Sequence, residues 1–297
     1  MLWLYAACGA YLLSAISAVI DKTLLSSKIP VPALYAFYSG LLSVGVLLLA
    51  PFGFSFIGYG FVAIALCGGG LFLFSLLFAY MAIARWDISR VSPVVGAFSA
   101  LFTFLFAYLF IGEILGAWHI IAFVLLVGGG LILSFRYKTF FAWDVFFLAV
   151  LSALFLAASF VLSRFVFDGV GFLNGFIWVR LGSFVWALLF LLFPSFWRLL
   201  KKSPGARSPS SLGFVVGNKI IGAVGFFILN FAISLGPLSL VNALKSVEYV
   251  LVFVLALSVG ALTKNRFFVE DGRRWVVIQK VIGVVVVGVG IFILYIT

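Results

Sequence analysis

Four polar side chains recur at helical spacing inside one long apolar run near the C-terminal end of the chain. They are Asn242, Lys245, Glu248 and Tyr249. Steps of three and four residues place side chains on one face of an α-helix. A lysine on that face can bind a carboxylate or a phosphate, while a deep glutamate either positions the lysine or titrates. Glu248 is therefore the candidate proton-coupling residue, and a purely structural pair of Lys245 with Glu248 is the alternative.

Further polar residues interrupt other apolar runs. Arg180 lies well inside its run, and the corresponding place in the first half of the chain holds Tyr38. Lys219 and Asn230 nearly share one helical face. A charge at the centre of a bilayer costs roughly 2.5–3.5 kcal/mol, so such residues are functional candidates. Lys219 has an alternative role, because it lies close enough to a charged loop to extend its ammonium group into water.

Together these eight side chains form the candidate substrate-binding set. Within it, Arg180 and Lys245 against Glu248 leave a net positive charge, and Lys219 would increase that charge. A positive site favours an anionic or zwitterionic small molecule over a bulky cation, because complementary charge selects the partner.

The surroundings of these residues follow from the composition. Of 297 residues, 66% are hydrophobic and 9% are charged, whereas a soluble domain carries about 25% charged residues. Such a chain has too few polar groups to cover a surface in water, which excludes a soluble enzyme, a secreted disulfide scaffold and a disordered tail. The 19 Lys and Arg residues outnumber the 8 Asp and Glu residues. We assign this excess to cytoplasmic loops and expect no nucleic-acid partner.

Apolar runs of about 17–25 residues predict transmembrane helices. The runs are too long and too uniform for the strands of a barrel, so we expect an all-α polytopic protein of the cell (inner) membrane, with the lipid bilayer as a partner. The connection 201–211 is rich in Ser, Pro and Gly and predicts a mobile loop. Arg164 and Asp168 are expected to form an interfacial ion pair. The ten predicted spans are 2–20, 32–50, 57–83, 90–111, 115–134, 143–164, 172–193, 213–235, 238–260 and 276–296.

The two halves of the chain match each other in one informative stretch. Residues 82–91 align without gaps with 232–241, and both are predicted to form the turn between a third and a fourth helix. Each half then has five helices, and an odd number inserts the second half upside down. Corresponding loops of the two halves differ as this inversion requires, because a loop that carries Lys and Arg in one half matches a loop without them in the other. If the basic loops lie in the cytoplasm, both termini lie outside the cell. We therefore predict two inverted five-helix repeats, 1–138 and 139–297.

The first half carries two motifs that occur together in one family. Ser89-Arg90-Val91-Ser92-Pro93 opens an apolar helix that closes with Gly112-Glu113, and the fifth predicted helix contains Gly128-Gly129-Gly130. With a second copy of the architecture behind them, these motifs resemble the EamA-type transporters of the drug/metabolite transporter superfamily over essentially the whole chain. The second half departs from the pattern by placing Ala243 where the proline stands. The resemblance implies ten helices, alternating access and cytoplasmic termini, and the last of these opposes the orientation given by the loop charges.

These observations predict a secondary active transporter of a small anionic or zwitterionic metabolite, with its site between the two repeats near mid-bilayer. Protons or a counter-substrate would drive it, because the sequence has no nucleotide-binding motif. No catalytic residue, metal or cofactor is expected, since the sequence has 1 His and neither an HExxH nor a GxSxG motif. The alternatives are a flippase for a lipid or lipid-linked metabolite, a non-transporting accessory membrane subunit, and an intramembrane enzyme.

Overall fold

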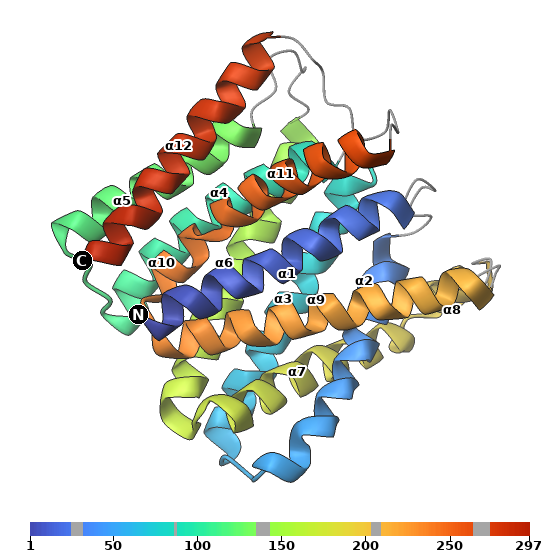
Figure 1. Cartoon of the computed structure of the whole chain (residues 1–297). Coiled ribbons are helices and arrows are strands. Elements are labelled where there is room, and N and C mark those ends of the chain that lie inside the picture. Colours follow the sequence, from blue (N-terminus) through green and yellow to red (C-terminus); the bar gives the residue numbers. More distant parts are fainter. Residues whose placement is uncertain (25–31, 86–87, 135–142, 203–208, 264–273) are drawn as a thin grey trace. The chain divides into compact units, whose positions relative to one another are not determined.

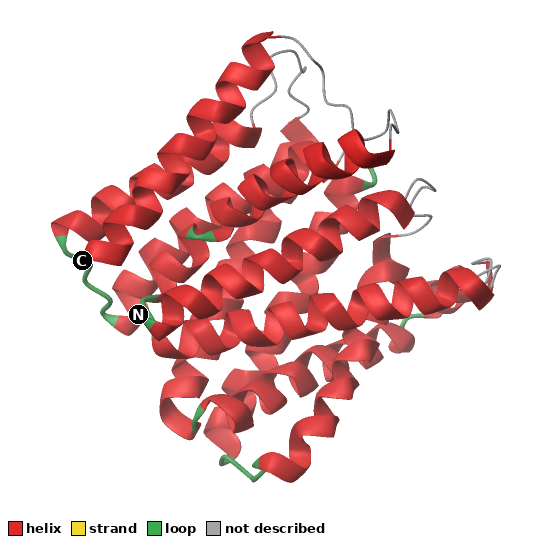
Figure 2. Ribbon diagram, viewed as in Figure 1, coloured by secondary structure: helices red, strands yellow, loops and turns green. Residues whose placement is uncertain are grey.

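The computed structural model describes residues 1–24, 32–85, 88–134, 143–202, 209–263 and 274–297. Every regular element within these ranges is a helix (Figure 2). The helices form two compact units that are not contiguous in sequence. Unit 1 comprises Met1–Ser27, Ile114–Lys138 and Ser208–Thr297, and unit 2 comprises Lys28–Glu113 and Thr139–Arg207.

Unit 1 is built from pairs of long helices. The helix α1 packs along α9, α5 packs along α12, and α11 contacts both α1 and α5 (Figure 1). The short helix α10 contacts α5 and α9 and leads directly into α11. The helices of this unit are α1 (Leu2–Leu24), α5 (Ala117–Ser134), α9 (Pro209–Leu235), α10 (Leu238–Ala243), α11 (Lys245–Thr263) and α12 (Arg274–Ile296).

Unit 2 is arranged around one long helix, α3. The helices α2, α6 and α7 pack against α3, and α4 packs mainly against α6. Three helices end in a tighter or wider turn before the connection that follows them. The elements are α2 (Pro32–Leu42), the 3₁₀-helix η1 (Ser43–Phe52), α3 (Tyr59–Ile83), α4 (Ile88–Phe106), the π-helix η2 (Ala107–Ile111), α6 (Trp143–Val170), α7 (Phe172–Leu189), the 3₁₀-helix η3 (Phe190–Leu192) and α8 (Pro194–Lys202).

The glycine triplet of α3 explains why two helices approach it so closely. The hydroxyl of Ser159 in α6 donates a hydrogen bond of 2.8 Å to the carbonyl of Gly68. The hydroxyl of Ser183 in α7 donates one of the same length to the carbonyl of Gly69. A Cβ atom at Gly69 would overlap the backbone of α7 at Val179. Small residues and serine hydroxyls of this kind bring helices together where no water competes.

Eight helical segments of the described chain are long and apolar enough to cross a membrane. Two further apolar helices, Ala117–Leu133 and Ile220–Leu235, are shorter. The structure therefore confirms an all-α architecture of the multi-pass membrane type. A count of ten spans stays a prediction.

Two predicted spans differ from the structure in their interiors, whereas the spans 90–111 and 172–193 change helix type only near their ends. The span predicted at 238–260 is not one helix, because α10 ends at Ala243 and α11 begins at Lys245. The span predicted at 32–50 changes to a 3₁₀-helix at Ser43. The Ser43 hydroxyl donates to the carbonyl of Ser39, four residues back, and such side-chain bonds to the preceding turn bend helices.

The loop predicted at 201–211 is shorter than expected. Residues 201–202 belong to α8, and residues 209–211 belong to the first turn of α9. Residues 203–208 lie outside the described residues. The sequence did not predict α8, because its nine residues are too few and too basic to form an apolar run.

The compact units do not coincide with the two halves of the sequence. Each unit takes helices from both 1–138 and 139–297. A sequence repeat and a compact unit are different divisions of a chain, since helices of one repeat can pack with helices of the other. The inverted repeat therefore stays a prediction.

Candidate functional site

The chain breaks its helical path in the middle of the predicted polar set. Leu244 separates α10 from α11, with backbone angles φ −62° and ψ −5°. Its amide donates a hydrogen bond of 3.0 Å to the carbonyl of Leu240, and its own carbonyl accepts one of 2.9 Å from the amide of Val247. The second bond spans three residues where an α-helix spans four, so the turn is locally tighter.

Side chains satisfy carbonyls that this break exposes. The last carbonyls of any α-helix lack partners within that helix. The hydroxyl of Tyr11 in α1 donates a buried hydrogen bond of 3.0 Å to the carbonyl of Val241. The hydroxyl of Ser246 donates one of 3.1 Å to the carbonyl of Ala243. The break is thus a stabilised feature of unit 1, and we call this turn at Leu244 the α10–α11 break.

The four polar residues of the predicted helix lie on both sides of the break. Asn242, in α10, is buried with 2% of its surface exposed. Lys245 opens α11, and Glu248 lies in the first turn of that helix. Lys245 and Glu248 interact electrostatically across one turn. Both are half-buried, as is Tyr249, so the structure brings the set together around the break.

Four sources of charge act at the break. The N-terminal end of α11 carries the positive end of the helix dipole, equivalent to about half an elementary charge. Lys245 adds a full positive charge at the same end, and Glu248 offsets it. Glu248 also interacts electrostatically with Tyr11 on α1. The C-terminal end of α10 meets the break from the other side with the negative end of its dipole. Charges of both signs therefore lie beside buried hydrogen-bonding groups, and Lys245 is the group among them that can bind an anion.

The glycine-rich part of α5 packs directly against the break. A Cβ atom at Gly130 would lie 3.1 Å from the Cβ of Ser246 and 3.5 Å from the ring of Tyr249. A larger residue at Gly130 would push α5 away from α11. The triplet that first suggested a family resemblance therefore lies where one helix of unit 1 meets the candidate site.

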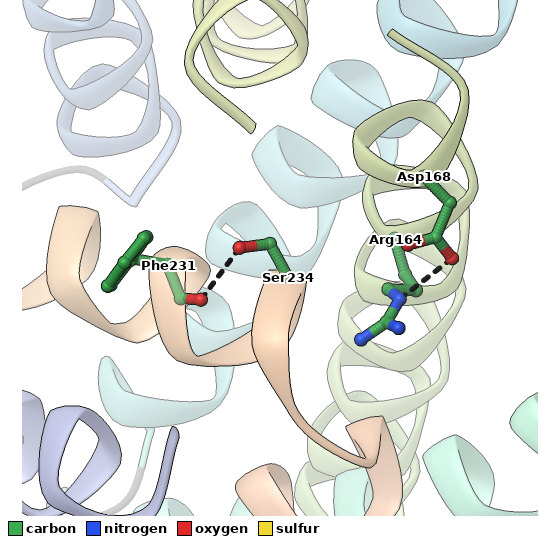
Figure 3. Close-up of polar contacts among 4 residues, drawn as sticks. All are labelled: Arg164, Asp168, Phe231 and Ser234. Atoms are coloured by element: carbon green, nitrogen blue, oxygen red, sulfur yellow. Dashed lines mark hydrogen bonds and ion pairs between the residues drawn. The ribbon is translucent and has the colours of Figure 1, made fainter. Parts of the chain in front are cut away.

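Two candidates lie on α9. Asn230 is buried, and its amide nitrogen donates a hydrogen bond of 2.9 Å to the carbonyl of Phe226 in the same helix. Ser234, one turn later, likewise donates to the carbonyl of Phe231 (Figure 3). Lys219 belongs to α9, but its side chain lies outside the described residues.

The remaining two candidates belong to unit 2. Arg180, in α7, is half-buried, and its guanidinium carbon lies 4.6 Å from the centre of the Phe72 ring in α3. An arginine over an aromatic face is stabilised by a cation–π interaction. Tyr38, in α2, is 48% exposed and its ring lies beside that of Phe37. The structure thus places the predicted set in two units, six residues in unit 1 and two in unit 2.

The predicted pair of Arg164 and Asp168 is confirmed as an ion pair. The Nε atom of Arg164 lies 2.8 Å from a carboxylate oxygen of Asp168, one turn further along α6 (Figure 3). The pair neutralises itself, which leaves it outside the candidate site. Among the residues that the structure describes, no three His, Cys, Asp or Glu side chains gather as metal ligands.

The sequence analysis missed Tyr11 and Phe72. Tyr11 was hard to identify from the sequence, because a single tyrosine in an apolar span can also be an interfacial residue. Phe72 had no signal at all, since the chain has 37 Phe residues and only the fold selects the one beneath Arg180.

Comparisons with known proteins identify the fold and nothing more. No protein-family model matches the sequence, and no curated protein is detectably similar to it. A solved crystal structure is similar with a TM-score of 0.71 and 18% sequence identity, over 98% of this chain and 95% of that one. At this identity the likeness supports a common fold alone.

Proposed function

We propose that the chain is a secondary active transporter of a small anionic or zwitterionic metabolite. Its ten transmembrane helices form two inverted five-helix repeats of the EamA type, and alternating access exposes a site between the repeats near mid-bilayer. Arg180 and Lys245 bind the anionic group of the substrate. Glu248 couples transport to protons or positions Lys245.

The α10–α11 break is the observation that carries this proposal. Irregular backbone inside a bilayer is tolerated only where protein buries it or where it lines a water-filled cavity. Transporters use such broken helices to bind substrates, with helix N-termini directed at anionic groups. Here the break coincides with Lys245 and Glu248, two charges that an apolar helix would otherwise exclude. Arg180 supports the same interpretation in unit 2.

One observation supports the count of ten helices, and another supports their inverted arrangement. The shorter apolar stretches, Ala117–Leu133 and Ile220–Leu235, lie within α5 and α9, which have 18 and 27 residues. At 1.5 Å per residue, about 20 residues cross the hydrocarbon core, so both helices are near or above that length. The exchange of basic residues between corresponding loops supports the inversion of the second repeat.

Counterflow in proteoliposomes tests the proposal. Vesicles are loaded with pooled anionic, zwitterionic or cationic metabolites, and wild-type protein is compared with Arg180→Ala and the matched control Arg164→Ala. We expect saturable flux of anions or zwitterions that Arg180→Ala abolishes and Arg164→Ala retains. Arg164 is a suitable control because it lies in the same unit and is already paired with Asp168.

Other outcomes would contradict different parts of the proposal. Cation flux that survives Arg180→Ala would retain a transporter but reject the positive site. An absence of flux for every metabolite, with scrambling of lipid headgroups, would favour the flippase. An absence of both activities would favour an accessory subunit.

A further inference from the structure

The helix α8 has one face that packs onto unit 2. Phe196 is buried, and its ring centre lies 5.0 Å from that of Phe37 in α2 and 5.7 Å from that of Phe190 in η3. Leu199 and Leu200 pack against the same apolar cluster. The spacing of three and four residues places all three side chains on one face of the helix. The helix is therefore held against the body of unit 2.

The other residues of α8 have a different character. Trp197 is 49% exposed, and its indole nitrogen donates a hydrogen bond of 2.7 Å to the carbonyl of Leu191. Arg198 is exposed. The sequence continues with Lys201 and Lys202, three and four residues after Arg198. Basic residues on one side and apolar residues on the other are typical of helices that lie in a membrane interface.

Connectivity places α8 at the edge of the bilayer. The preceding helical segment, 172–192, has 21 residues, and at 1.5 Å per residue it spans about 31 Å, close to the thickness of the hydrocarbon core. Leu192 and Phe193, directly before α8, are exposed apolar residues. The cluster beneath α8 includes Leu34 from the start of α2. The helix therefore begins where the span leaves the lipid chains.

The charge of α8 has no internal counterpart nearby in sequence. No Asp or Glu occurs between Asp168 and Glu248. Arg85, two residues after the end of α3, has by contrast a carboxylate partner in Asp144 at 3.0 Å. At the depth of a membrane interface the abundant anions are phospholipid headgroups, and these attract basic residues that lie near the surface.

We propose that α8 lies in the membrane interface and that Arg198, with Lys201 and Lys202 that follow it in the sequence, binds the headgroups of anionic phospholipids. The apolar face fixes the helix on unit 2, the tryptophan ring lies at the level of the headgroups, and the three cations select negative lipids. This inference does not depend on transport activity, so the outcome of its test does not decide the proposed function.

Fluorescence quenching at Trp197 tests the proposal in full-length protein. Wild type is reconstituted into bilayers of phosphatidylcholine and phosphatidylglycerol, with bromine on the acyl chains of one lipid at a time. Subtraction of the same measurement on Trp197→Phe isolates this tryptophan from the others. Each basic residue near an anionic surface strengthens association about fivefold. We therefore expect phosphatidylglycerol to be preferred at least fivefold in wild type.

Three variants separate the outcomes. R198Q/K201Q/K202Q should lower the preference to near unity, while the charge-preserving R198K/K201R/K202R should retain it and Arg85→Gln should not change it. Circular dichroism checks that each variant is helical. An equal response of wild type to both lipids would overturn the proposal, as would an unchanged preference in the triple glutamine variant. Loss of the preference in the presence of free glycerol phosphate would indicate a site for a soluble phosphate and would also overturn it.

Discussion

The hydroxyl of Tyr11 in α1 donates a hydrogen bond of 3.0 Å to the carbonyl of Val241 in the last turn of α10. The two residues are 230 positions apart in sequence. Tyr11 is buried, with 3% of its surface exposed, so no water competes for the carbonyl. The helix α1 thereby stabilises the break that places Lys245 and Glu248 at the start of α11. The position of the candidate site depends on a helix at the other end of the chain.

Replacement of Tyr11 by Phe tests this dependence. The phenyl ring fills nearly the same space, but the Val241 carbonyl loses its donor, and an unsatisfied buried group costs about 1–3 kcal/mol. We expect a lower temperature of thermal unfolding and a severalfold lower flux in the counterflow assay. Tyr5→Phe is the matched control, because Tyr5 lies on the same helix and is 60% exposed. Equal effects of the two substitutions would contradict a specific role for Tyr11.

A second prediction concerns proton coupling at Glu248. Glu248→Gln keeps the size of the side chain but removes its titration, so the flux should lose its dependence on pH while substrate binding is retained. Lys245 on the same helix and Tyr11 on α1 interact electrostatically with Glu248. Tyr11 in turn interacts with Tyr249 and Cys8. Initial rates measured between about pH 5 and 8, in roughly half-unit steps, show whether the flux depends on pH in wild type and in the variant.

Asp168→Asn serves as the control for the Glu248 prediction. Asp168 is paired with Arg164 and partly exposed, so its substitution should leave the pH profile intact. If Glu248→Gln also leaves the profile intact, Glu248 has no coupling role, and its function is to position Lys245.

The helices of this chain could be predicted because length and composition suffice for them. An apolar run needs no partner to be read as a helix, and a charge inside it, such as Glu248, is visible at once. The break at Leu244 could not be predicted, since neither proline nor glycine marks it. It depends on Tyr11 and on the back-bonding of Ser246, and only the tertiary structure brings Tyr11 to it.

The division into two compact units could not be predicted either, because it depends on contacts that only the tertiary structure makes. Serine hydroxyls in α6 and α7 donate to glycine carbonyls of α3, and these bonds join three helices of unit 2. The position of a serine in an apolar run does not indicate which backbone carbonyl its hydroxyl will bond to. Arg180 was predictable as a deep charge, whereas its stacking partner Phe72 was one phenylalanine among many.

A third prediction distinguishes charge from geometry at Arg180. Arg180→Lys keeps the positive charge but loses the planar group that stacks on Phe72 and binds a carboxylate with two hydrogen bonds. We expect the apparent KM for anionic substrates to rise about tenfold, equivalent to about 1.4 kcal/mol, with a smaller change in the maximal rate. Arg164→Lys, which keeps its pairing with Asp168, should leave both parameters unchanged. An unchanged KM in Arg180→Lys would show that charge alone is sufficient.

The last prediction concerns the close contact between α3 and α7. Gly69→Ala would place a methyl group against the backbone of α7 at Val179 and near Ser183, whose hydroxyl bonds to the Gly69 carbonyl. Backbone atoms cannot move aside as a flexible side chain can, so α7 must shift as a whole. Overpacking of this kind costs about 1–3 kcal/mol or more, and thermal unfolding in detergent, followed by circular dichroism, should report it as a lower midpoint.

Gly60→Ala is the control, because nothing lies within 4 Å of a Cβ atom at Gly60 on the same helix. Alanine there should be neutral or stabilise by up to about 1 kcal/mol, since it favours the helical backbone. Similar midpoints for the two variants would mean that the α3–α7 contact does not hold unit 2 together.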